Sequence, residues 1–123
     1  MLIKDLKYSS FLFLLLLTVY SVDAQQLLTK MQLDSCRIFS GIEEALVNPE
    51  KVYVVDLSSS GLKKIPPEIA QLKNIQRLNL SNNFISELPE FLFRFKNLQE
   101  LNLEENRLDS LPSAIGYLNN LKK

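Results

Sequence analysis

Few side chains in this chain could catalyse a reaction. Among its 123 residues there is no histidine, the most common general base and metal ligand. Cys36 is its single cysteine, which excludes an internal disulfide and a cysteine-based metal cluster. The acidic pairs Glu43-Glu44 and Glu104-Glu105 are adjacent in sequence, and the three glycines are too far apart for a phosphate-binding loop. These observations favour a protein that is not an enzyme and that uses no cofactor and no metal.

Polar and charged side chains recur instead at a fixed spacing, which suits binding rather than catalysis. Arg77 and Glu100 lie 23 residues apart, and Asp56, Asn79 and Asn102 repeat at the same interval. Side chains at one period meet side by side when the elements that hold them stack. The sequence therefore predicts a recognition surface with these residues: Tyr53, Val54, Asp56, Gln76, Arg77, Asn79, Gln99, Glu100, Asn102 and Glu104.

Three repeats must position that surface. They span residues 52–74, 75–97 and 98–120, and residues 121–123 begin a fourth. Seven apolar columns and one proline column agree in all three copies. The proline column is Pro66, Pro89 and Pro112. A fixed period of this length is typical of a stacked solenoid, in which each unit buries its apolar face only against its neighbours.

Each repeat carries signals for a strand, a turn and a return segment. Apolar residues alternate at its start, which predicts a short strand with one buried face, and strands of successive copies should pair in parallel. The ninth column is Asn83 and Asn106, whose side chains can bond the main chain of neighbouring turns, but Ser60 in the first repeat. Proline after the fourteenth column should open a short helical segment.

This pattern resembles the leucine-rich-repeat family, with consensus LxxLxLxxNxLxxLPxxIxxLxxL. It is most similar to the 23-residue Leu-Pro class of bacterial, plant and Ras-suppressor-like proteins. The resemblance implies an α/β repeat solenoid with short parallel strands on the concave face and short helical or 3-10 segments on the convex face. It also implies a non-catalytic module that recognises a protein partner through the concave face.

The first 24 residues are expected to be a signal peptide. Lys4 and Lys7 precede an apolar core over residues 11–20, and Val22-Asp23-Ala24 is a small-residue cleavage pattern that leaves Gln25 as the new N-terminus. The chain would then be secreted or periplasmic, or at the cell surface. The alternative is a membrane anchor formed by residues 9–22.

Residues 25–51 are expected to form an N-terminal cap. Ser40-Gly41-Ile42-Glu43 matches a capping box, and a short helix with Ile42, Ala45 and Leu46 should then cover the first repeat before Asn48-Pro49 ends it. Two points remain open. Leu27, Leu28, Met31 and Leu33 either add to this cap or form a mobile leader, and Cys36 either is buried in the cap or pairs between molecules. The lead-in also resembles the EEAL-x-NP-x-x-V segment of secreted bacterial members of the family.

The sequence is compatible with several partners. The recognition surface runs from apolar at Tyr53 and Val54 to acidic at Glu104 and Glu105, which suits a polar or basic protein surface. Phe91 is the candidate for a contact on the convex side, whereas Phe93 is expected to fill space between repeats. The balanced charge does not favour nucleic acid. The alternatives are self-assembly through an uncapped third repeat, or the N-terminal part of a larger receptor or adaptor.

Overall fold

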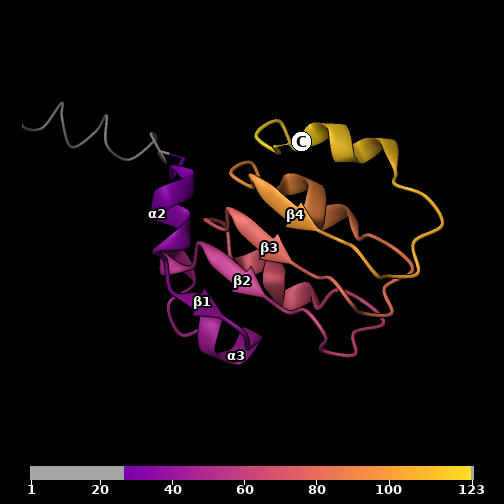
Figure 1. Cartoon of the computed structure of the whole chain (residues 1–123), viewed down its shortest axis with the longest axis horizontal. Coiled ribbons are helices and arrows are strands. Elements are labelled where there is room, and N and C mark those ends of the chain that lie inside the picture. Colours follow the sequence, from indigo (N-terminus) through magenta and orange to yellow (C-terminus); the bar gives the residue numbers. More distant parts are fainter. Residues whose placement is uncertain (1–26, 123) are drawn as a thin grey trace, which may run out of the picture.

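The computed structural model describes residues 27–122, which form an open sheet of parallel strands covered on one side by 3-10 helices (Figure 1). The sheet has the order β1-β2-β3-β4, and its strands are β1 (Ile38–Phe39), β2 (Val54–Asp56), β3 (Arg77–Asn79) and β4 (Glu100–Asn102). Each repeat supplies one strand and one 3-10 helix, and these helices are η2 (Pro67–Gln71), η3 (Glu90–Arg94) and η4 (Ser113–Tyr117). The predicted α/β repeat solenoid is thus confirmed. The expected signal peptide lies outside the described residues.

The register of the strands follows the period of the sequence. Val54 pairs with Arg77 and Arg77 with Glu100, while Asp56, Asn79 and Asn102 form a second row. The intervening row, Val55, Leu78 and Leu101, points to the side of the 3-10 helices because successive side chains of a strand alternate between the two faces. We call the opposite face of the sheet the concave face.

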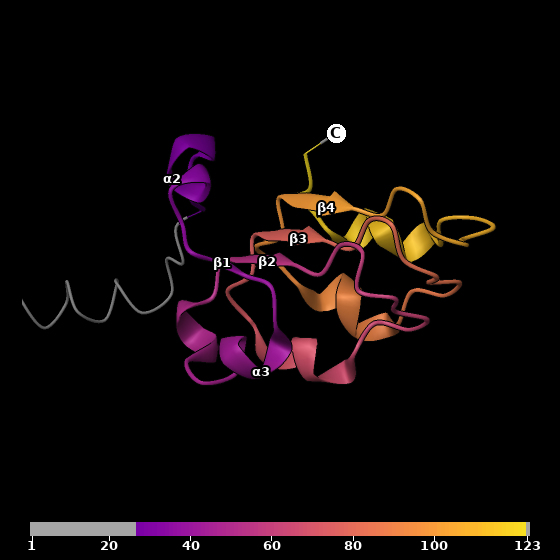
Figure 2. The ribbon, with the colours of Figure 1, turned by 60° about the horizontal axis from the view of Figure 1, so that its bottom comes forward.

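The prolines open the return segments, as predicted. Pro66, Pro89 and Pro112 each stand directly before a 3-10 helix, with φ of −59°, −72° and −66°. Proline holds φ near this value and offers no N–H, which suits the first turn of a helix. Figure 2 shows these helices on one side of the strands, where they form the convex side.

The core is the stack of apolar columns between the strands and the 3-10 helices. In the second repeat Ile75, Leu78, Leu80, Ile85 and Leu92 are fully buried. Leu111 was expected in the same core, yet 58% of its surface is exposed. It belongs to the last repeat, whose outer side has no further repeat against it among residues 27–122, so its column is only half covered.

Asparagine side chains join successive turns. Asn83 Oδ1 accepts hydrogen bonds from the amides of Ser60 and Leu62 in the previous repeat, at 3.1 Å and 2.9 Å. Its Nδ2 donates to the carbonyls of Leu57 and Leu80, both at 2.9 Å. Asn106 repeats these roles one unit later, since it accepts from the Ile85 amide and donates to the Leu80 carbonyl. This confirms the predicted role of the ninth column.

A second asparagine column, which sequence reasoning missed, joins the last position of a repeat to the main chain of the segment or repeat before it. Asn74 Nδ2 donates to the carbonyl of Glu50 at 2.7 Å, and Asn120 Nδ2 donates to the carbonyl of Lys96 at 2.6 Å. The signal was present in the sequence, because the twenty-third column reads Asn74, Asn97 and Asn120.

The N-terminal cap is more elaborate than the single helix expected from sequence. Helix α3 (Ile42–Ala45) does cover the first repeat, and Ala45 joins the core cluster. Strand β1 also extends the sheet beside β2, and η1 (Pro49–Lys51) connects α3 to the first repeat. No helix among residues 27–122 is long and apolar enough to cross a membrane, and the alternative anchor over residues 9–22 lies outside the described residues.

The expected capping box at Ser40 is wrong. The N-cap of α3 is Gly41, which has no side chain to cap it. The capping box instead starts helix α2 (Lys30–Asp34), where Thr29 Oγ1 accepts from the Gln32 amide and Gln32 Oε1 accepts from the Thr29 amide. The stretches Thr29–Gln32 and Ser40–Glu43 both fit the rule. Only Thr29 stands directly before the first residue of a helix, as the cap requires.

Asn83 and Asn106 together form what we call the asparagine ladder, which leads to a first prediction. We expect Asn83→Ala to lower the free energy of unfolding by about 2–4 kcal/mol, because it leaves several buried main-chain groups without partners. Urea unfolding followed by circular dichroism measures this. Asn119→Ala is the matched control, since Asn119 is exposed and its loss should change stability by less than about 0.5 kcal/mol. Equal effects of the two substitutions would contradict a structural role for the ladder.

Candidate functional site

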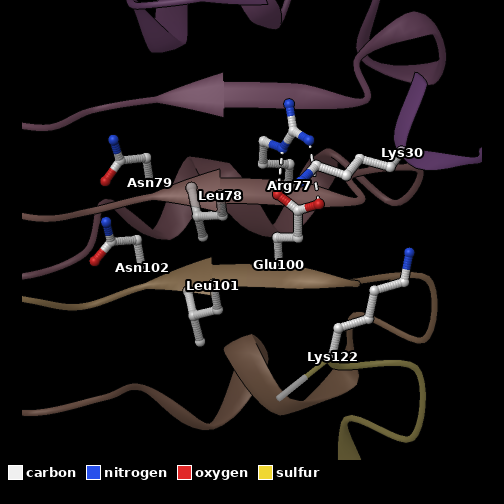
Figure 3. A pocket seen from close by; sticks show the side chains of 8 residues that line it. All are labelled: Lys30, Arg77, Leu78, Asn79, Glu100, Leu101, Asn102 and Lys122. Carbon is white, nitrogen blue, oxygen red and sulfur yellow. Dashed lines mark hydrogen bonds and ion pairs between the residues drawn. The ribbon is translucent and has the colours of Figure 1, made fainter. Parts of the chain in front are cut away.

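A groove on the concave face is the candidate site (Figure 3). It encloses about 470 Å³ over β3 and β4, and its lining is Lys30, Arg77, Leu78, Asn79, Glu100, Leu101, Asn102 and Lys122. The strands bring their side chains to one place because residues of the same column are directly paired in the sheet. Lys30 comes from α2, and Lys122 follows the third repeat.

An ion-pair network crosses the groove. Arg77 Nε lies 2.5 Å from Glu100 Oε2, and Arg77 Nη2 lies 3.1 Å from Glu100 Oε1. The predicted cross-strand ion pair is therefore present and is bidentate. The same Nη2 lies 2.8 Å from Asp34 Oδ1 at the end of α2. One guanidinium therefore connects β3, β4 and the N-terminal segment.

This network changes the acidity of its members. Hydrogen bonds from Arg77 lower the pKa of Glu100 below its ordinary value, although burial opposes them, and the charges of Lys122 and Lys30 lower it further. The hydrogen bond to Glu100 in turn raises the pKa of Arg77. Figure 3 shows Lys30 and Lys122 reaching in from the end at which the strands begin. Three cationic side chains thus share the lining with one carboxylate, and the groove carries a positive excess.

The row Asp56, Asn79 and Asn102 is tied into the turns that follow the strands. Each side chain accepts a hydrogen bond from the amide two residues later, at 2.9 Å, 3.1 Å and 3.0 Å respectively. Burial by itself would raise the pKa of Asp56, but hydrogen bonds from Ser58 and Asn79 outweigh it and lower the pKa. These residues present fixed polar groups because their own turns hold them.

Three predicted surface residues are in fact buried. Val54 is 2% exposed, Gln76 0% and Gln99 2%, although all three were expected to project from the concave face. For the two glutamines the cause is the segment before the cap, since the main chain of Leu28 bonds to both side chains. Val54 lies in β2 between β1 and β3, where it pairs with Ile38 and Arg77.

The groove unites only part of the predicted surface. Arg77, Asn79, Glu100 and Asn102 line it together. Tyr53 is half-buried beside the covered region, whereas Glu104 is exposed beyond the groove, and neither belongs to its lining.

Sequence reasoning missed Lys30, Asp34 and Lys122. The capping box Thr29–Gln32 was the signal for Lys30 and Asp34, since it places a helix directly before the cap. Lys122 falls in the second column of the fourth repeat, the same column as Gln99, and its amide donates to the Gln99 carbonyl at 2.7 Å. Extending the columns past the third repeat would have placed it.

The two phenylalanines of the convex side do not differ as expected. Phe91 was the candidate for an exposed contact, but it is half-buried and packs against the core. Phe93 also packs against the core, as expected, yet it is Phe93 that lines a surface hollow, together with Arg94, Lys96, Tyr117, Asn119 and Asn120. A 3-10 helix has about three residues per turn, so alternate positions do not face opposite sides as they would in a strand.

The arrangement is suited to binding. Within residues 27–122 no group of three or more histidine, cysteine, aspartate or glutamate side chains is placed to hold a metal ion. The groove offers a charged network with fixed amides at its far end, which can hydrogen-bond and pair with a polar ligand. Cys36 is half-buried between α2 and β1, which is compatible both with a place in the cap and with pairing between molecules.

The acidity of Glu100 gives a second prediction. A carboxyl whose pKa is lowered by folding stabilises the protein above its unfolded pKa of roughly 4.3, and this stabilisation disappears as the pH falls through the lower folded value. We expect Glu100→Gln to reduce the free energy of unfolding by about 1 kcal/mol at pH 7 and by much less at pH 3. Urea titrations at the two pH values measure this.

Glu104→Gln is the control for this experiment, because Glu104 is exposed and lies outside the network. It should leave stability nearly unchanged at both pH values. A Glu100→Gln effect as large at pH 3 as at pH 7 would show that the ion pair is not the cause.

Comparisons with known proteins agree with this fold. The family model described as leucine rich repeat matches residues 50–108 and, in a second match, residues 73–123. A solved leucine-rich-repeat protein of Leptospira interrogans matches with 44% sequence identity and a TM-score of 0.65, over 69% of this chain and 22% of that protein. This chain thus spans about a fifth of that protein's length. No curated protein matches significantly. On the family match and its three stacked repeats, the chain belongs to the leucine-rich-repeat family.

Proposed function

We propose that this chain is a binding module that holds a protein partner on its concave face. The repeat fold is suited to protein interaction because its parallel strands display side chains in fixed rows. The observation that carries the proposal is the groove over β3 and β4, where Arg77, Asn79, Glu100 and Asn102 meet two lysines.

The charges of the groove favour an acidic segment of the partner. Glu100 already pairs with Arg77, whereas Lys30 and Lys122 extend beside that pair. A carboxylate placed between the two lysines would meet positive charge on both sides. The exposed Glu104 and Glu105 would face a basic part of the same partner, as expected from the sequence.

The strand side of the groove is preformed before a partner arrives. Arg77 is paired with Glu100, and Asn79 and Asn102 are each hydrogen-bonded to their own turn. Binding to preformed side chains loses little conformational entropy, so most of the contact energy is available for affinity.

We further propose that the module acts outside the cytoplasm, secreted or periplasmic. The support is the sequence of residues 1–24, with its basic start, apolar core and small-residue cleavage pattern. An exported chain without paired cysteines depends for its stability on the apolar columns and the asparagine ladder.

A second candidate function is stacking on further repeats, within a larger receptor or between copies of the chain. The observation that favours it is the exposure of Leu111 on the third repeat, at 58%, whereas Ile65 in the same column of the first repeat is 4% exposed. A fourth repeat would cover Leu111 as the second repeat covers Ile65. The two functions are compatible, because stacking uses the end of the array and binding uses the concave face.

The groove provides a third prediction. Reversing its two free charges with Lys30→Glu and Lys122→Glu should weaken binding of an acidic partner by at least about tenfold, which corresponds to 1.4 kcal/mol. Proteins cross-linked to the purified chain identify the partner, and titration calorimetry with the purified partner measures the affinity.

Lys63→Glu with Lys73→Glu is the matched control, since both lysines are exposed and lie outside the groove. This control carries the same total charge as the groove variant. A partner that loses equal affinity for both variants responds to net charge alone, and one that binds both as tightly as the unaltered chain does not use the groove.

Export gives a fourth prediction. Expression of the full chain in a bacterial host should yield an extracytoplasmic product that starts at Gln25, as determined by intact mass and N-terminal sequencing. Ala24→Leu should block this cleavage, because the site requires a small side chain. A membrane-bound product that retains residues 1–24 would favour the alternative anchor.

A further inference from the structure

Residues 28–34, which we call the α2 segment, lie on the concave face as a bound peptide would. At one end the Leu28 amide donates to Gln76 Oε1 at 2.8 Å, and Gln99 Nε2 donates to the Leu28 carbonyl at 2.8 Å. At the other end Asp34 accepts from Arg77 at 2.8 Å. The segment stands in Figure 1 at the ends where β2 and β3 begin.

The glutamine pair recognises main chain rather than a particular side chain. Gln99 Nε2 donates to Gln76 Oε1 at 2.8 Å, and together the two buried amides contact both the N–H and the C=O of one residue. Every residue except proline carries these two groups. Specificity must therefore come from the other contact, in which Arg77 favours a carboxylate.

The hold on the α2 segment is weak. Leu33 is its only buried side chain, and Met31 is 83% exposed. Leu33 also lies outside the hydrophobic core cluster, so the repeats do not depend on it. The Asp34 side chain is 54% exposed, and water screens such an ion pair. A segment with so few buried apolar contacts opens at lower free energy than the strands beneath it.

The glutamine pair also retains an unused donor. Gln76 is fully buried, yet its Nε2 has no hydrogen-bond acceptor among residues 27–122. A buried donor without a partner is costly, and the α2 segment does not satisfy it. A ligand with one more acceptor at this point would make a contact that the α2 segment lacks.

We propose that the α2 segment is an intramolecular occupant of a peptide-binding site. In trans the site takes a peptide that offers a main-chain N–H and C=O to Gln76 and Gln99 and a carboxylate to Arg77. This inference rests on the proposed function, since the partner enters the same face by displacing the α2 segment. The α2 segment sets a threshold for the affinity of the partner, because a tethered segment competes with the partner at an effective concentration in the millimolar range.

The test uses a synthetic peptide of residues 27–36 with Cys36→Ser, titrated by calorimetry into two full chains. One chain is unaltered, and the other carries Leu33→Ala, which weakens the α2 segment without touching the core cluster. We expect the peptide to bind the Leu33→Ala chain at least about tenfold more tightly, because its tethered competitor is weaker. If Leu33→Ala unfolds the chain, Asp34→Asn replaces it.

Two controls isolate the proposed contacts. A peptide with a methyl group on the Leu28 nitrogen cannot donate to Gln76 and should bind at least about tenfold more weakly. The Met31→Ala chain should bind the peptide no better than the unaltered chain, since Met31 is exposed and contacts neither anchor. Equal binding to the unaltered and Leu33→Ala chains, or none to either, would overturn the proposal.

Hydrogen exchange of the Leu28 amide separates this proposal from the proposed function. Partner binding should accelerate that exchange and leave the Leu78 amide protected. A partner that binds through Lys30 and Lys122 while Leu28 stays protected would refute displacement and leave the binding function intact. Peptide binding in a chain for which no partner uses the groove would support the site and refute the proposed function.

Discussion

Every turn in this molecule must satisfy main-chain groups that it removes from water, and the rest of the structure depends on how this is done. A solenoid repeats one turn many times, so a turn with an unpaired amide would repeat its cost in every unit. Asn83 and Asn106 meet this demand with one side chain per turn, which bonds amides and carbonyls of two adjacent repeats. The same side chains join each turn to the next one, directly after the strands whose rows form the concave face.

Those rows explain why the side chains of the site are fixed in place and why part of the site is already occupied by the chain itself. The parallel register places Arg77 beside Glu100 and thereby produces a cross-strand ion pair. That pair leaves Arg77 with a free N–H, which the N-terminal segment uses through Asp34. The surface that the fold creates for a ligand is thus partly filled by the chain itself. The part of this surface that stays open is the groove, and α2 borders it on one side through Lys30.

The 23-residue period of the sequence correctly predicted the structural features that follow from the local sequence pattern. It placed the strands, the proline-led helices, the cross-strand rows and the role of Asn83, because each follows from residues at a fixed column. The period did not predict contacts between residues that lie far apart in the sequence. Burial of Gln76 and Gln99 arises from Leu28, which lies 48 and 71 residues away, and no periodic signal encodes that contact. Two stretches satisfied the capping rule, and the rule itself did not distinguish Thr29, which caps α2, from Ser40, which lies one residue before the N-cap of α3.

The direction of the asparagine ladder has a consequence for the order in which the chain folds as it emerges. Asn83 completes the turn of the repeat before its own, and Asn106 does the same one unit later. A chain that leaves the ribosome or a translocation pore from its N-terminus therefore exposes each turn before the residue that closes it. Folding must trail emergence by one full repeat, so the newest repeat outside the pore is always the one open to proteases and chaperones.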